Sequence, residues 1–92
     1  MISREVVITR NFDAGEAAAL NHRPISRFVG VATKYTDCRI WILHEDRRLN
    51  AKSYLGICSL GISKGMKVTL TADGADEVAA LDELEQFLTS EN

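Results

Sequence analysis

The chain has 92 residues, of which 46% are hydrophobic and 26% are charged. This balance is typical of a soluble globular chain and excludes a disordered tail, and the length predicts one domain over residues 1–92. Eleven Lys and Arg against thirteen Asp and Glu give a formal net charge of −2, which argues against direct binding to nucleic acid.

The first third of the chain predicts a strand, an irregular stretch and a helix. Three consecutive β-branched residues at positions 6–8 favour a strand over residues 5–9. Residues 10–20 are irregular, although residues 13–16 (DAGE) resemble a capping box that could start an extra helical turn. Between residues 23 and 35 the apolar residues follow the spacing of one helix face; they are Ile25, Phe28, Val29 and Ala32.

The middle of the chain predicts a hairpin and then a short helical turn. Residues 38–43 and 47–52 are predicted to be extended, with a polar turn between them in which His44 is exposed. Alternation places Ile40 and Ile42 on one face of the sheet and Trp41 on the other. Trp41 is then either an association anchor or a single exposed aromatic. Ser53 is a good N-cap for a helical turn over residues 53–58.

The last third predicts a strand over residues 66–72 and a helix over residues 76–88. The helix carries one apolar face, made of Val78, Leu81, Leu84 and Leu88. Asp82, Glu83 and Glu85 are expected to stay in solvent. The element order is therefore β-α-β-β-α-β-α. Hairpin-connected strands and helices with single apolar faces predict an α+β fold of two layers, with the sheet covered on one side only.

No targeting, metal or redox signal stands out. Apolar runs such as residues 40–43 are far shorter than the roughly 20 residues of a membrane span. The N-terminus lacks the pattern of a secretory signal, so we expect a cytoplasmic protein. Cys38 and Cys58 have neither CxxC spacing nor a nearby His, which favours two reduced thiols and no metal or cofactor.

The element order and several segments resemble HPr, the histidine-containing phosphocarrier family of the bacterial sugar phosphotransferase system. The segments are residues 50–53 (NAKS), 59–62 (SLGI) and 65–77 (GMKVTLTADGADE), together with Arg23 and Pro24 at the start of the first helix. The resemblance implies a four-stranded antiparallel sheet with three helices on one face. It also implies phosphoryl transfer from Enzyme I, through a histidine, to Enzyme II A subunits.

The chain departs from the family at the phosphorylated histidine. When Arg23 and Pro24 are aligned on the family's Arg-Pro, Asn21 takes the histidine position and His22 the following one. An amide nitrogen cannot carry phosphate as an imidazole does, so Asn21 is interpreted as an N-cap that also contributes to partner binding. One residue is about 100° of helix rotation, which would take the ring of His22 off the anion site.

Two interpretations of His22 stay open. It is either a relocated phosphoryl carrier with Arg23 as its electrostatic partner, or a solvated side chain. The pattern is similar to that of catabolite-repression HPr, a paralogue that lacks the active histidine but keeps a second phosphorylation site. In this chain that second site corresponds to Ser53, for which the alternative is an unmodified N-cap.

The resemblance implies partners for both sites. If Ser53 is the switch, the partners are HPr kinase/phosphorylase and a catabolite control regulator, which would dock on Tyr54 and Leu55 unless these pack inward. Arg23 and Arg27 lie one turn apart and could meet an acidic partner.

The leading hypothesis is a regulatory phosphoprotein, a substrate of a kinase rather than an enzyme. The alternative is a working phosphocarrier through His22. A third possibility is an interaction module in which neither site is phosphorylated. A monomer or a dimer that exchanges its first strand is expected.

Overall fold

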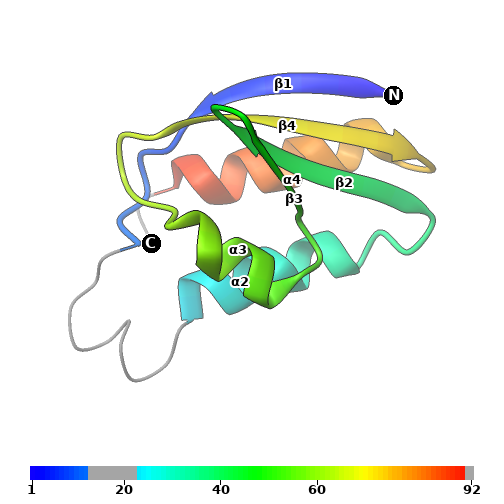
Figure 1. Ribbon diagram of the computed structural model, residues 1–92. Helices are drawn as coiled ribbons and strands as arrows, with labels where there is room; N and C mark the ends of the chain where they lie inside the picture. The colour runs from blue at the N-terminus through cyan, green and yellow to red at the C-terminus, as the bar shows by residue number, and fades with distance from the viewer. Residues whose placement is uncertain (13–22, 91–92) are drawn as a thin grey trace.

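The computed structural model describes residues 1–12 and 23–90, and the elements in them follow the predicted order (Figure 1). The strands are β1 (Ile2–Val7), β2 (Cys38–His44), β3 (Arg47–Asn50) and β4 (Lys67–Gly74). The helices are α2 (Arg23–Thr33), α3 (Tyr54–Leu60) and α4 (Glu77–Thr89). The strands pair antiparallel in the order β1-β4-β2-β3, and the helices cover one face of the sheet. The predicted α+β fold of two layers is confirmed.

The core lies between the sheet and the helices, and strand alternation decides which residues enter it. Ile40 and Ile42 are buried while Trp41, between them, is half-buried on the opposite face, as predicted. The described helices fill the other side of the core with Phe28, Ala32, Ile57, Leu60, Ala80, Leu81, Leu84 and Leu88. Each fully buried Leu, Ile or Phe contributes about 1.5–3 kcal/mol, so this layer carries most of the stability. None of the helices in the described part is long and apolar enough to cross a membrane.

The first strand begins earlier than predicted. It spans Ile2–Val7 rather than residues 5–9, because β4 supplies partners along that length, from Ile2 opposite Ala72 to Val7 opposite Lys67. The chain then leaves the sheet, and the N–H groups of Thr9 and Arg10 both donate to the carbonyl of Leu88, at 3.1 and 3.0 Å. The strand therefore ends where the end of α4 becomes the hydrogen-bond partner.

Other boundaries differ by a few residues, for reasons of hydrogen bonding. Helix α2 ends at Thr33, and the next two N–H groups donate to carbonyls three residues back. Helix α3 extends beyond the predicted turn to Leu60, where Gly61 ends it in the left-handed conformation (φ 70°). A glycine adopts that conformation without steric cost.

Two expectations about side chains were wrong. Val78 is 55% exposed, since the buried face of α4 is centred on Ala80, Leu81 and Leu84, and Val78 lies about 100° or more from that centre at 100° per residue. His44 is half-buried at the end of β2 rather than exposed in the turn, and its Nδ1 lies 3.2 Å from the carbonyl oxygen of Lys67.

The acidic residues of α4 are less uniform than predicted. Asp82 is exposed, but Glu83 and Glu85 are half-buried because they face basic residues of neighbouring elements. Arg4 of β1 donates to Asp82 at 2.6 Å and to Glu85 at 3.0 Å. Glu83 accepts from Lys34 and, at 2.6 Å, from the hydroxyl of Tyr35. Ion pairs thus fasten α4 to β1 and to the end of α2.

Candidate functional site

Ser53 is the N-cap of α3, as the sequence predicted. Its backbone is extended (φ −100°, ψ 111°), and its Oγ accepts a hydrogen bond from the N–H of Gly56 at 3.1 Å. Gly56 leaves room for this side chain, because a Cβ built on it would lie 3.2 Å from Ser53 Oγ. The hydroxyl is therefore held at the surface end of the helix by one hydrogen bond.

The two residues after Ser53 divide between solvent and packing. Leu55 is 79% exposed, so of the two alternatives left open for it, inward packing does not apply. Tyr54 is half-buried and forms hydrogen bonds with Cys58 of its own helix and Ser26 of α2. Burial and the hydrogen bond with Cys58 raise the pKa of Tyr54, and the bond with Ser26 opposes them. Tyr54 thus joins α3 to α2, and Leu55 stays exposed to solvent.

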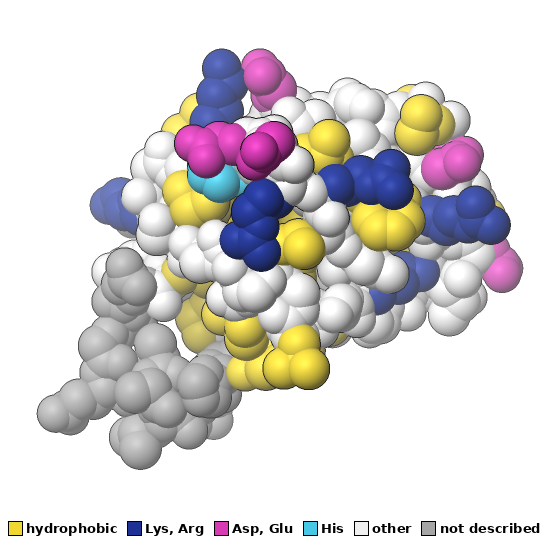
Figure 2. Space-filling view, in the orientation of Figure 1, with side chains coloured by type: hydrophobic (Ala, Val, Ile, Leu, Met, Phe, Trp, Pro, Cys, Tyr) yellow, Lys and Arg dark blue, Asp and Glu magenta, His cyan; other side chains and the backbone are white. Residues whose placement is uncertain are grey.

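The exposed side of α3 is apolar. Figure 2 shows hydrophobic side chains gathered over α3 at the lower edge of the molecule. Leu55 is 79% exposed, and covering its side chain with another protein would be favourable because apolar surface would leave water. Ser53, Tyr54 and Leu55 thus form one surface, which we call the α3 surface.

Lys52 does not contribute to the α3 surface, although it precedes Ser53. Its Nζ donates to the carbonyl oxygens of Tyr35 and Cys38, both at 2.6 Å. These bonds hold the ammonium group near the start of β2, and they join the segment between β3 and α3 to the segment between α2 and β2. Among the described residues, the Ser53 hydroxyl has no cationic partner, and its one hydrogen bond is the cap bond from Gly56.

Arg27, the other predicted contact residue, lies on the side of α2 that faces α4. Its guanidinium carbon is 5.8 Å from the ring centre of Phe87 in α4, and it lines a shallow groove with Gln86 and Ser90. Because Ser26 faces α3, the next residue along the helix faces elsewhere. The structure therefore brings Ser53, Tyr54 and Leu55 together and separates Arg27 from them.

The residues of the predicted carrier site lie outside the part of the chain that is described. These are Asn21 and His22, and the same holds for the predicted capping box at residues 13–16. Arg23 is the first residue of α2, and its side chain is also outside the described part. The geometry of the His22 alternative therefore stays a prediction.

Arg10 is a residue that the sequence analysis missed. It is buried, and its Nη1 donates to Ser90 Oγ at 2.8 Å and to the carbonyl of Phe87 at 3.5 Å. Its guanidinium carbon lies 4.1 Å from the ring centre of Phe87. Burial lowers the pKa of Arg10, and the charge of Arg27 lowers it further. Val6, Ile8, Arg10 and Phe12 are all buried, so the period-two burial of β1 continues beyond the end of the strand, and this alternation was the signal available.

Known proteins resemble this chain both in sequence and in fold. The family model described as "PTS HPr component phosphorylation site" matches residues 4–90. HPr-like protein Crh of Bacillus subtilis is 38% identical over 72 residues, which are 78% of this chain and 84% of the relative. Phosphocarrier protein HPr of Buchnera aphidicola is 39% identical over 70 residues, 76% of this chain and 81% of the relative.

A crystal structure has the same fold along nearly the whole chain. Phosphocarrier protein HPr from Bacillus anthracis superposes with a TM-score of 0.80 at 29% identity, covering 96% of each chain. The similarity in sequence and in fold thus extends over both the α3 surface and the sheet. The chain belongs to the HPr family of the phosphotransferase system.

Proposed function

We propose that this HPr-family protein is a regulatory phosphoprotein switched at Ser53, in which the histidine relay is degenerate. The observation that carries the proposal is the position of the Ser53 hydroxyl, which caps α3 beside the exposed side chain of Leu55. The presence of Asn21 at the family's histidine position supports the second half of the proposal. The protein is then the substrate of a kinase rather than a catalyst.

The chemistry at Ser53 is phosphoryl transfer from ATP. Ser53 Oγ attacks the γ-phosphorus, a new O–P bond forms, and the bond between the γ-phosphorus and the bridging oxygen breaks. ADP leaves, and the hydroxyl proton passes to a base of the kinase. Only one hydrogen bond, from the N–H of Gly56, involves Ser53 Oγ in the cap, and phosphate oxygens can accept that bond in its place.

The added phosphate would change the α3 surface without rebuilding the fold. It brings a charge of about −1.5 to −2 at pH 7, next to the apolar side chain of Leu55. The ammonium group of Lys52 lies at the carbonyl oxygens of Tyr35 and Cys38, at 2.6 Å each, so it is directed toward the start of β2 and not toward this phosphate. The switched surface therefore suits a partner that pairs a basic group with an apolar pocket, as a catabolite control regulator would.

The test uses the full chain with HPr kinase/phosphorylase and ATP, followed by intact mass and acid treatment. We expect one acid-stable phosphate that is absent from Ser53→Ala and present in Ser59→Ala. Ser59 is a matched control because it lies in the same helix, is exposed, and bonds to Gly56 and Arg47 instead. Absence of the adduct, or its persistence in Ser53→Ala, contradicts the proposal.

A parallel reaction with Enzyme I and phosphoenolpyruvate separates the alternative. An acid-labile adduct that disappears in His22→Ala would identify a working phosphocarrier with Arg23 beside it, and the proposed loss of the relay would then be wrong. If neither reaction modifies the protein, the chain is an interaction module on the HPr fold.

A further inference from the structure

A pocket of about 410 Å³ lies where β2 begins and β3 ends, apart from the α3 surface residues Tyr54 and Leu55. Its walls include Arg39 and Trp41 of β2, Asn50 at the end of β3, and Lys52. This volume is within the range of about 300–1,000 Å³ in which proteins bind small molecules. The chemistry of the walls indicates which small molecule the pocket fits.

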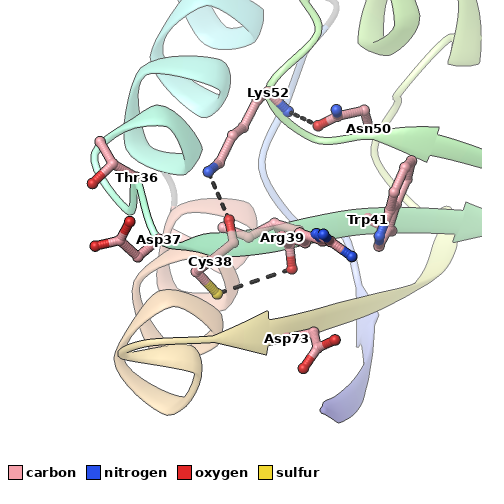
Figure 3. Close-up of a pocket in the computed structure, with 9 residues that line it drawn as sticks. Thr36, Asp37, Cys38, Arg39, Trp41, Asn50, Lys52 and Asp73 are labelled. Atoms are coloured by element: carbon pink, nitrogen blue, oxygen red, sulfur yellow. Dashed lines mark hydrogen bonds between the residues drawn. The ribbon is translucent and has the colours of Figure 1, made fainter.

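Trp41 provides a flat wall on the open face of the sheet. The guanidinium carbon of Arg48 lies over the ring at 4.5 Å from its centre and so occupies one side of the indole. Figure 3 shows the ring edge-on, with its other side turned toward Arg39 and the space of the pocket. Figure 2 shows basic side chains on both sides of a hydrophobic side chain over β2. Arg39 borders this second side of the indole, but among the described residues only Arg48 lies over the ring, so a planar ligand can stack on the side toward Arg39.

The cations around the pocket are not neutralised by carboxylates. Within residues 1–12 and 23–90, the side-chain nitrogens of Arg39, Arg48 and Lys52 have no carboxylate oxygen within 4.0 Å, the limit for an ion pair. By contrast, Arg4 and Lys34 each contact a carboxylate of α4. An ammonium group has three N–H donors, and the carbonyls of Tyr35 and Cys38 occupy two of those of Lys52. The third remains for a ligand.

Asn50 adds neutral donors to the same wall. Its Oδ1 accepts from the backbone N–H of Lys52 at 2.8 Å, which fixes the orientation of the amide. The two N–H donors of the Asn50 side chain then lie on the other side of the amide from the backbone N–H of Lys52. The wall formed by Arg39, Asn50 and Lys52 is consequently rich in donors.

Two carboxylates at the rim do not cancel this character. Asp73 lies 3.6 Å from the N-terminal ammonium of Met1, and in the view of Figure 3 its carboxylate points away from the space between Arg39, Trp41 and Lys52. The carboxylate of Asp37 points away from that space as well. The carboxylates are therefore turned away from the space that Arg39 and Lys52 border.

We propose that this pocket binds a mononucleotide, with the base stacked on Trp41 and the phosphate bound by Arg39 and Lys52. A flat ring fits the uncovered indole face, and a phosphate dianion fits two cations that lack a carboxylate partner. The pocket is separate from the hydroxyl of Ser53, so the inference does not depend on the phosphorylation proposed above.

The single tryptophan of the chain makes the test direct. The full-length protein, labelled with ¹⁵N, is titrated with AMP while the one indole N–H signal is followed by NMR. We expect a saturable shift of this signal and a dissociation constant about tenfold weaker in Arg39→Ala, because one charge-assisted hydrogen bond is lost. Arg47→Ala is the matched control, since Arg47 bonds to Ser59 and is not part of the pocket wall.

Two further titrations test the two halves of the proposal. Inorganic phosphate alone and adenosine alone should each shift the indole signal less than AMP does. No saturable shift with millimolar AMP overturns the proposal, and so does an equal effect of Arg39→Ala and Arg47→Ala, which would indicate non-specific attraction. An equal affinity for phosphate refutes the role of Trp41, and an equal affinity for adenosine refutes the role of the cations.

Discussion

The two faces of the sheet use the same residue types for different purposes. On the face covered by helices, Arg4 contacts two carboxylates of α4, and the neighbouring apolar side chains are buried. On the open face, Arg39 is exposed without a carboxylate partner in the described part of the chain, and Arg48 lies on Trp41. The covered face is therefore built for stability, whereas the open face can change with little effect on folding.

The largest expected effect comes from truncating a leucine on the covered side. Leu84 of α4 is fully buried, so Leu84→Ala should lower the free energy of unfolding by about 2–5 kcal/mol through lost burial and a cavity. Leu55→Ala removes the same atoms from a leucine that is 79% exposed and should cost less than about 0.5 kcal/mol. Urea denaturation measures both, and equal losses would show that burial between the sheet and the helices does not set the contribution of a leucine to stability.

An intermediate effect is expected at Glu83, which joins α4 to the end of α2. Hydrogen bonds from Lys34 and then Tyr35 lower the pKa of Glu83. A lowered pKa stabilises the fold above the unfolded value of about 4.3 and loses that effect as the pH falls through the folded value. Glu83→Gln should thus cost about 0.5–1 kcal/mol at pH 7, and the difference from the wild type should shrink in acid.

The Tyr35–Glu83 contact also makes stability depend on pH at the alkaline end, where its contribution is lost as the pH rises. The hydrogen bond to Glu83 raises the pKa of Tyr35 to about 12, so its contribution is complete below the unfolded value of about 10 and is lost as the pH rises toward the folded one. Urea denaturation across this range compares the wild type, Glu83→Gln and Asp46→Asn, an exposed turn residue. A Glu83→Gln curve that coincides with that of the wild type at every pH would show that the contact adds no stability.

The smallest effect is expected on the open face. Arg39→Ala should change the free energy of unfolding by less than about 0.5 kcal/mol, since its guanidinium forms no ion pair among the described residues. Thermal unfolding followed by circular dichroism checks this, with Arg4→Ala as the comparison from the covered face. A larger loss in Arg39→Ala than in Arg4→Ala would show that the open face is also structural.

Local patterns predicted most of the fold and part of the site. The alternation of Ile40, Trp41 and Ile42 placed each side chain on the correct face, because the side chains of a strand alternate with a period of two. Ser53 was identified as an N-cap because a serine at a helix start needs only the N–H groups of the next few residues. The boundary error at β1 arose because partners distant in the sequence, in β4 and at the end of α4, decided where that strand begins and ends.

The sequence by itself determined the order of the elements, the faces of the strands and the cap at Ser53, since each depends on residues within one or two turns of one another. Only the tertiary structure decided that Arg10 is buried against Ser90, that Arg27 faces α4 rather than Tyr54, and that Lys52 points toward Tyr35 and Cys38. Such contacts join residues up to 80 positions apart. A long polar side chain can reach many partners, and packing selects among them.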